Sequence, residues 1–150
     1  MQKLSFGYFN NLNLSLRGVS ILAVDDHADC RDFLSMLFQL YEADAKVVSS
    51  ASQAFDVFLQ FQPQILVIDI AMPVVDGFGL LESIRRLEAA KQSQPKTPAI
   101  AMTAVVTDMI CQKTYQAGYQ SLFPKPIDID AFIATIANIT CAAARCYRFS

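Results

Sequence analysis

The sequence has little of what metal-binding or disulfide-stapled proteins need. It holds a single histidine, His27, and its four cysteines show no C-x-x-C spacing: Cys30, Cys111, Cys141 and Cys146. A structural zinc site needs several imidazole or thiolate ligands at short spacing, so this pattern excludes the common zinc motifs. Because residues 1–20 lack the apolar core of a secretory signal, we expect the cysteines to remain reduced thiols.

Charge and long apolar runs are also scarce. The formal net charge is −2, so no electrostatic attraction to nucleic acid or to an anionic membrane is expected. No apolar stretch is long enough to span a bilayer. A hydrophobic fraction of 53% with 17% charged residues indicates one compact globular domain. We therefore expect a cytoplasmic protein that contacts neither nucleic acid nor membrane directly.

What the sequence does contain is a regular alternation of short apolar runs with amphipathic stretches. Runs typical of buried strands occur at 19–24, 46–49, 65–69, 99–103 and 121–123. Apolar residues at helical spacing lie between them, with Asp29 and Ser52 as expected helix caps and Gly118 as an expected helix end. The pattern predicts an α/β fold: a flavodoxin-like, doubly wound, five-stranded parallel sheet in the order 2-1-3-4-5, with helices on both faces.

Polar residues follow four of the predicted strands. Asp25 and Asp26 follow the first strand, Asp69 the third, Thr103 the fourth and Lys125 the fifth. In this fold the ligand crevice lies at the carboxyl ends of the strands, so we expect the three carboxylates to lie side by side there. Two unit charges ~4 Å apart repel by about 4 kcal/mol at an effective dielectric constant of 20. A divalent cation with oxygen ligands, Mg²⁺, is therefore expected between them.

Neighbouring residues have simpler explanations when taken singly. His27 follows the two acids, but without a second histidine we interpret it as a loop residue rather than a metal ligand. Asp76 and Gly77 are expected to shape a loop and the start of the next helix rather than to take part in chemistry.

The chain resembles the receiver domain of two-component response regulators over roughly residues 18–140. The resemblance rests on these residues in combination: Asp25-Asp26, Asp69, Met72-Pro73, Gly77, Thr103-Ala104 and Lys125-Pro126. It implies that Asp69 accepts a phosphoryl group from the phosphohistidine of a sensor histidine kinase or a histidine phosphotransfer protein.

The resemblance also implies the roles of the other residues at the site. Asp26, Asp69 and the backbone carbonyl of Ala71 would bind Mg²⁺, with Asp25 acting largely through water. The Thr103 hydroxyl and the Lys125 ammonium would contact the phosphoryl oxygens. The bond between Lys125 and Pro126 is expected to be cis, as in the family.

Two departures from the family pattern concern switching and the lifetime of the phosphorylated state. Leu122 stands where the family usually has an aromatic residue that moves with the threonine, and the adjacent Phe123 is expected to point to the other face of the sheet. Ala71 and Val105 border the approach of a hydrolytic water, and neither side chain can orient one by hydrogen bonding. We therefore expect a long-lived phosphorylated state.

We expect the domain to pass on its signal by binding another protein, because the expected organisation has no output domain. We expect an extension over 1–17, the receiver domain over 18–146, a tail over 147–150 and no output domain. A downstream protein or a second copy of the chain is expected to bind the face formed by the last two helices and the last strand. The apolar residues of the final helix cover more than one core-facing stripe needs: Ile129, Phe132, Ile133, Ile136 and Ile139.

Other interpretations stay open beside a stand-alone receiver. A receiver segment of a hybrid histidine kinase, or a phosphorelay intermediate, would use the same chemistry. An aspartate-nucleophile phosphatase needs a second acid two residues after the nucleophile, where this chain has Ala71. A flavin binder of the same fold would place its phosphate in an acidic crevice that repels it. We therefore predict a signalling domain rather than an enzyme, one that catalyses only its own phosphorylation and slow dephosphorylation.

Overall fold

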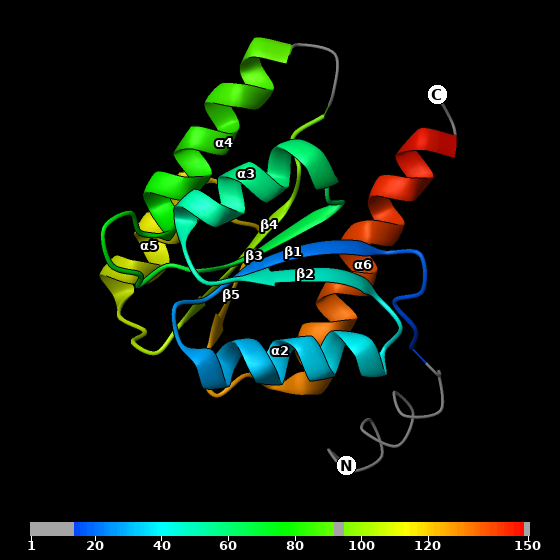
Figure 1. The fold of residues 1–150 in the computed structure, drawn as a ribbon, viewed down its shortest axis with the longest axis horizontal. Coiled ribbons are helices and arrows are strands. Elements are labelled where there is room, and N and C mark those ends of the chain that lie inside the picture. The colour runs from blue at the N-terminus through cyan, green and yellow to red at the C-terminus, as the bar shows by residue number, and fades with distance from the viewer. Residues whose placement is uncertain (1–13, 92–94, 149–150) are drawn as a thin grey trace.

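The computed structural model describes residues 14–91 and 95–148, with side chains up to residue 141. Strands and helices alternate along this part of the chain, and their labels follow Figure 1. The elements are β1 (Ser20–Val24), α2 (Ala28–Leu40), β2 (Asp44–Val48), α3 (Ala51–Phe61), β3 (Ile65–Asp69), α4 (Gly77–Lys91), β4 (Ala99–Thr103), α5 (Asp108–Ala117), β5 (Ser121–Pro124) and α6 (Ile129–Arg148).

The strands form one parallel sheet in the order β2-β1-β3-β4-β5, which confirms the predicted topology. Chain direction along the sheet reverses between β1 and β3, and this is where open α/β sheets form a crevice. In the register, Val24 pairs with Ile68, and Thr103 pairs with Pro124. The carboxyl ends of these strands therefore lie along one edge, and the residues that follow them meet there.

The sheet separates two apolar cores because successive strand residues point to opposite faces. On one face, Leu66 and Ile68 pack with residues of α3 and α4. On the other, Ile65 and Val67 pack with residues of α2 and α6. Figure 1 shows α3, α4 and α5 on one side of the sheet and α2 and α6 on the other. All five residues of β3 are buried, as expected for the central strand.

The helix caps differ in part from those expected. Ser50, not Ser52, is the N-cap of α3, and its side chain accepts a hydrogen bond from the Gln53 amide. The N-cap position of α2 is His27, and Asp29 lies inside the first turn. Gly118 ends α5 in the left-handed conformation, as predicted. The second strand begins at Asp44, before the predicted run, because backbone pairing with β1 extends beyond the β-branched residues.

Leu16, before β1, and the helix α6 both contribute to the apolar core beneath α2. Leu16, within the expected extension 1–17, is fully buried there, and its amide donates to the Tyr41 carbonyl at 2.8 Å. Residues 1–13 lie outside the described part of the chain. In α6, Phe132, Ile133 and Ile136 are fully buried, and only Ile129 among the apolar residues named for this helix is exposed, at 38%. The expected surplus of exposed apolar area on α6 is therefore small.

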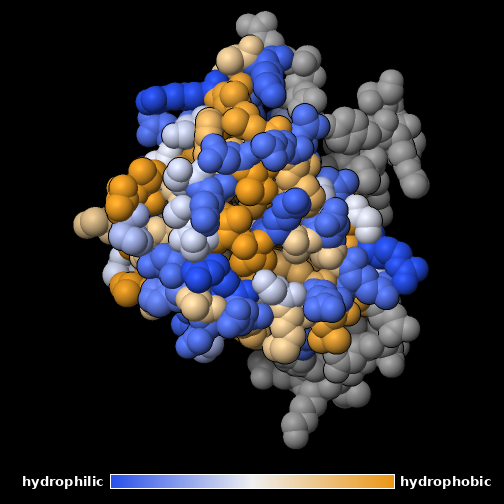
Figure 2. All heavy atoms as spheres, viewed as in Figure 1, coloured by the Kyte–Doolittle hydropathy of each residue, from blue (hydrophilic) through white to orange (hydrophobic). Residues whose placement is uncertain are grey.

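The surface is mixed in character. Figure 2 shows hydrophobic residues reaching the surface along α3 and α4 among hydrophilic ones, without one large apolar patch on this face. Among the described residues, no helix combines the length and hydropathy needed to cross a membrane. Cys30, Cys111 and Cys141 are free thiols, as expected, and Cys146 lies beyond the described side chains.

Candidate functional site

Three carboxylates meet at the carboxyl edge of the sheet. Asp25 follows β1 directly and is fully buried, and Asp69 ends β3 with 2% of its surface exposed. Together with Asp26 and His27 they offer ligand atoms that all lie within 4.8 Å of one another. The sequence prediction that the strand ends would bring these acids side by side is confirmed.

Lys125 supplies the positive charge at this site from the end of β5. Its Nζ lies 2.6 Å from Asp25 Oδ2 and 3.2 Å from Asp69 Oδ2. The Lys125 amide donates to the Thr103 carbonyl at 2.8 Å, which fixes the backbone as it leaves the sheet. The peptide bond between Lys125 and Pro126 is cis, as predicted. One ammonium group thus contacts two buried carboxylates from different strands.

Burial and the crowding of these charges shift the pKa values of Asp69 and Lys125. Burial raises the pKa of Asp69 above its ordinary value, and the negative charge of Asp25 acts in the same direction. The hydrogen bond from the Ala71 amide and the Lys125 ammonium lower that pKa without cancelling the rise. Burial lowers the pKa of Lys125, but the hydrogen bond to Asp25 and the charge of Asp69 outweigh it, so this pKa is raised. The two carboxylates therefore favour the charged form of Lys125.

In the described part of the chain, a buried oxygen of Asp26 has no hydrogen-bond partner. Asp26 Oδ1 is buried, and none of the described residues makes a hydrogen bond to it. His27 Nδ1 lies 3.2 Å from this oxygen, but on a side chain that is 68% exposed. An unpartnered buried carboxylate oxygen beside two further carboxylates is what a site for a hard divalent cation presents. His27, which we expected to be a loop residue, lies beside the acidic cluster. It occupies the N-cap position of α2, but its side chain makes no capping hydrogen bond.

Thr103 and Ala71 complete the rim of the site. The Thr103 side chain is buried, and its hydroxyl donates to the Val105 carbonyl at 3.0 Å and accepts from the Val105 amide at 3.2 Å. The Ala71 amide donates to Asp69 Oδ1 at 3.0 Å. The Val105 side chain is 62% exposed beside these groups. Neither Ala71 nor Val105 contributes a polar side chain, as the sequence indicated.

Leu122, at the position where the family usually has an aromatic residue, and Phe123 point to opposite faces of the sheet, as predicted. Leu122 is partly buried against the core below α3 and α4. Phe123 points to the opposite face, where its ring meets that of Phe132 edge-on, with centroids 5.3 Å apart. Phe123 therefore cannot replace the missing aromatic without turning through the sheet.

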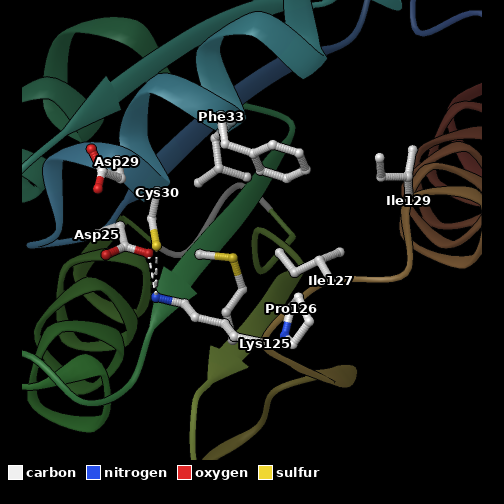
Figure 3. A pocket seen from close by; sticks show the side chains of 10 residues that line it. Asp25, Asp29, Cys30, Phe33, Lys125, Pro126, Ile127 and Ile129 are labelled. Carbon is white, nitrogen blue, oxygen red and sulfur yellow. Dashed lines mark hydrogen bonds and ion pairs between the residues drawn. The ribbon is translucent and has the colours of Figure 1, made fainter.

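Two side-chain contacts at the site were not anticipated from the sequence. Cys30 Sγ lies 3.7 Å from Lys125 Nζ, and Arg31 donates to the Asp25 carbonyl at 3.0 Å. Both residues lie in the first turn of α2, so their position depends on how that helix packs. Figure 3 shows Cys30, Asp25 and Lys125 converging at the end of a largely apolar pocket of about 320 Å³. The pocket lies between α2 and the start of α6, and its apolar lining is Phe33, Leu34, Met102, Pro126, Ile127 and Ile129.

Known proteins share this sequence pattern. A family model described as the response regulator receiver domain matches residues 21–137. The chain is 33% identical, over 76% of its length and 84% of the relative's, to an uncharacterized 14.6 kDa protein in the sodA1 3' region of Leptolyngbya boryana. It is 30% identical to hybrid signal transduction histidine kinase D of Dictyostelium discoideum and 32% identical to the transcriptional regulator NtrC of Klebsiella pneumoniae. These matches cover 79% and 80% of this chain but only 8% and 24% of the two larger proteins.

Solved structures share the fold. The receiver domain of the Francisella response regulator 1452 aligns with a TM-score of 0.75 at 22% identity, over 84% of this chain and 99% of that one. A chain in the co-crystal structure of the Saccharomyces cerevisiae phosphotransfer protein Ypd1 with the receiver domain of Ssk1 aligns at 0.78 and 21% identity, over 86% and 93%. At these identities the likeness concerns the fold alone. The sequence match over residues 21–137 goes further, and by it the chain belongs to the response regulator receiver domain family.

Proposed function

We propose that Asp69 is the phosphoacceptor of this receiver domain and takes its phosphoryl group from the phosphohistidine of a kinase or a phosphotransfer protein. The observation that supports this is the arrangement of its two oxygens. Asp69 Oδ1 accepts the Ala71 amide, whereas Oδ2 lies 3.2 Å from the Lys125 ammonium. The Ala71 amide orients the carboxylate, and Oδ2 is the oxygen beside a positive charge. We assign the attack on phosphorus to Oδ2.

The reaction exchanges one bond to phosphorus for another. Asp69 Oδ2 forms the new bond, and the bond from phosphorus to the donor's imidazole nitrogen breaks, with its electron pair returning to the imidazole. Negative charge on the phosphoryl oxygens must be stabilised throughout the transfer. Lys125 supplies one positive charge. The Thr103 hydroxyl now donates to the Val105 carbonyl, so it has to break that bond before it can donate to a phosphoryl oxygen.

The acidic cluster fits Mg²⁺, as the family resemblance implied. Asp26 has the unpartnered oxygen, and a carboxylate oxygen of Asp69 belongs to the same cluster of ligand atoms, so these two residues would hold the ion directly. The family resemblance adds the backbone carbonyl of Ala71 as a third ligand. Asp25 already accepts hydrogen bonds from Lys125 and the His27 amide, so we assign it an indirect role through its charge. When bound, the metal ion neutralises charge on the phosphoryl oxygens.

The partners of the site follow from the same proposal. One solved relative is a receiver domain crystallised with a histidine phosphotransfer protein, and one sequence relative is a hybrid histidine kinase. A phosphohistidine donor of either kind is proposed for this chain. It acts as a receiver in its own right or as the receiver segment of a hybrid kinase or phosphorelay. Phosphorylation is then read on the face of α5, β5 and α6, where exposed Met109 and Tyr115 offer apolar contact area to a downstream protein or a second copy.

The direct test is phosphorylation of wild type and of Asp69→Asn by acetyl phosphate with Mg²⁺. We expect the wild type to incorporate one labile phosphoryl group and the variant to incorporate none, because an amide cannot form the acyl phosphate. Asp76→Asn is the matched control, since Asp76 lies seven residues further on, caps Gly79 with its carboxylate and has no assigned role in transfer. Equal labelling of Asp69→Asn and wild type contradicts the proposal.

The output face is tested by sedimentation with and without beryllofluoride, which mimics the phosphoryl group. We expect self-association or capture of a defined downstream protein only in the presence of beryllofluoride. Met109→Ser, on exposed α5, should weaken that association without lowering the melting temperature. A protein that is monomeric in both states, and that binds its target equally with and without the mimic, contradicts this part of the proposal.

A further inference from the structure

A buried phenol connects two loops that flank the site. Tyr119 lies in the turn between α5 and β5 with 3% of its surface exposed. Its hydroxyl donates a hydrogen bond of 2.6 Å to the carbonyl of Gly77, 42 residues earlier in the chain. Burial raises the pKa of Tyr119 well above its ordinary value, and the negative charge of Asp76 acts in the same direction. The phenol therefore stays protonated, and it remains a donor at physiological pH.

The residue that Tyr119 binds is itself packed against the phosphoacceptor strand. A Cβ atom on Gly77 would lie 2.6 Å from Ile70 Cα and 3.0 Å from the Asp69 carbonyl oxygen, closer than side chains pack. The Gly77 amide donates to the Ile70 carbonyl at 3.2 Å. Gly77 thus closes the loop 70–76, which contains Ala71, back onto the end of β3. The Gly77 amide donates to Ile70, at the start of the loop, and the Gly77 carbonyl accepts the hydrogen bond from the Tyr119 hydroxyl.

Further contacts join the same two regions. The rings of Phe78 and Tyr119 meet edge-on, with centroids 6.3 Å apart. Lys113 of α5 places its Nζ 4.5 Å from the centroid of the Phe78 ring, within the range of a cation–π contact. The first turn of α4 is therefore tied to α5 and to the turn that leads into β5. Tyr119 and Leu122 belong to the same apolar core.

We propose that Tyr119 is a positioning residue of the phosphoacceptor site, whose hydroxyl holds Gly77 and so fixes the loop 70–76 beside Asp69. Through the same hydrogen bond, a rearrangement of that loop is transmitted to the turn between α5 and β5. This gives the chain an aromatic link to its output face although position 122 holds leucine. The effect on phosphorylation rests on the proposed role of Asp69, whereas the restraint of the loop 70–76 by Tyr119 does not.

The test compares Tyr119→Phe with Tyr115→Phe. Both changes delete one phenol oxygen, but Tyr115 is 81% exposed on α5 and serves as the matched control. Amide hydrogen exchange is measured first, with EDTA and no phosphodonor. Because a buried hydrogen bond is worth about 1 kcal/mol, we expect exchange in residues 70–77 to rise roughly fivefold to tenfold in Tyr119→Phe. Exchange in α3 should stay at the wild-type rate, and Tyr115→Phe should change neither region.

The second measurement is the Mg²⁺ concentration that gives half-maximal labelling by acetyl phosphate. We expect it to rise roughly fivefold in Tyr119→Phe, since the loop that carries the Ala71 carbonyl is no longer held in place. Unchanged exchange in 70–77, or an equal rise over the whole chain, overturns the inference. If hydrogen exchange changes as expected while the wild type is not labelled at all, the positioning role stands and the proposed function fails.

A wild-type measurement covers the case in which Tyr119→Phe does not fold. Hydroxyl protons that are buried and hydrogen-bonded exchange slowly enough with water to be seen by proton NMR. We expect one tyrosine hydroxyl signal with a cross-peak to the protons of Gly77 or Phe78. A spectrum of the folded wild type without such a signal overturns the inference as well.

Discussion

At Asp69, the burial that the proposed phosphoacceptor role requires conflicts with the stability of the folded protein. Its pKa is raised by burial, so the ionised form is disfavoured in the folded state. Without metal, this destabilisation is fully present above the folded-state pKa and is lost as the pH falls through it, because the folded protein then takes up a proton. Asn at this position can still accept the Ala71 amide, and Lys125 keeps its contact with Asp25.

Asp69→Asn is therefore expected to melt at a higher temperature than wild type in EDTA at pH 7. A gain of about 1 kcal/mol corresponds to a rise of about 2–4 °C in a domain of this size. The difference should shrink as the pH is lowered through the raised pKa of Asp69, because the wild-type carboxyl then takes up a proton and loses its charge too. Asp56→Asn, on the exposed surface of α3, is the control for loss of one charge. A lower melting temperature for Asp69→Asn at pH 7 contradicts this account.

We propose that Ala71 and Val105 set the lifetime of the phosphorylated state. Hydrolysis needs a water in line with the phosphorus, and neither side chain can hold one there. The double variant Ala71→Asn with Val105→Glu adds an amide and a carboxylate that can hold this water by hydrogen bonding. Positioning of this kind is commonly worth a factor of roughly 10² in rate. We expect label on the double variant to decay at least tenfold faster than on wild type in Mg²⁺. Decay of the wild type within seconds, or equal decay of the two proteins, contradicts the prediction.

The sequence identified some site residues and not others for a physical reason. Asp25, Asp69 and Thr103 end buried strands, and the order of a parallel sheet is enough to bring strand ends together. Cys30 contacts Lys125, and Tyr119 contacts the carbonyl of Gly77, only because a helix or a turn packs against its neighbours. No periodicity or spacing in the sequence records such a contact, so only the structure shows it.

At the scale of elements, the sequence predicted the kind and order of each helix and strand better than their ends. Ser50 and Ser52 flank the start of α3, and both are good cap residues by composition. Only Ser50 has the extended backbone that lets its hydroxyl reach the amide of Gln53. Where the backbone leaves the extended state depends on the preceding strand, which sequence pattern places only within a few residues.

Ser50→Ala should lower the free energy of unfolding by about 1 kcal/mol, the usual cost of a lost N-cap. Ser52→Ala, two residues into the helix, removes a hydroxyl without a cap bond and should change stability little or raise it, since alanine favours the helix interior. Urea unfolding of both variants measures the difference. A larger loss in Ser52→Ala than in Ser50→Ala would falsify the cap assignment.

The molecule as a whole is expected to gain stability from Mg²⁺. Repulsion among three carboxylates opposes folding, and a cation that binds only the folded state shifts the equilibrium towards it. We expect the melting temperature of wild type to rise with Mg²⁺ concentration. Asp26→Ala should abolish that rise, because it removes the carboxylate with the unpartnered oxygen, and should melt at or above the metal-free wild type. A rise with Mg²⁺ that survives in Asp26→Ala refutes the ligand assignment.

The ion pair between Lys125 and Asp25 spans 100 residues of chain. During synthesis, Asp25, Asp26 and Asp69 leave the ribosome well before Lys125, the lysine that offsets part of their charge. A product that stops between them carries Asp69 without the Lys125 ammonium, and it also lacks Phe132 and the rest of α6, which pack in the core beneath α2. Incomplete chains should therefore be unable to receive the signal, so that only finished molecules report it to the cell.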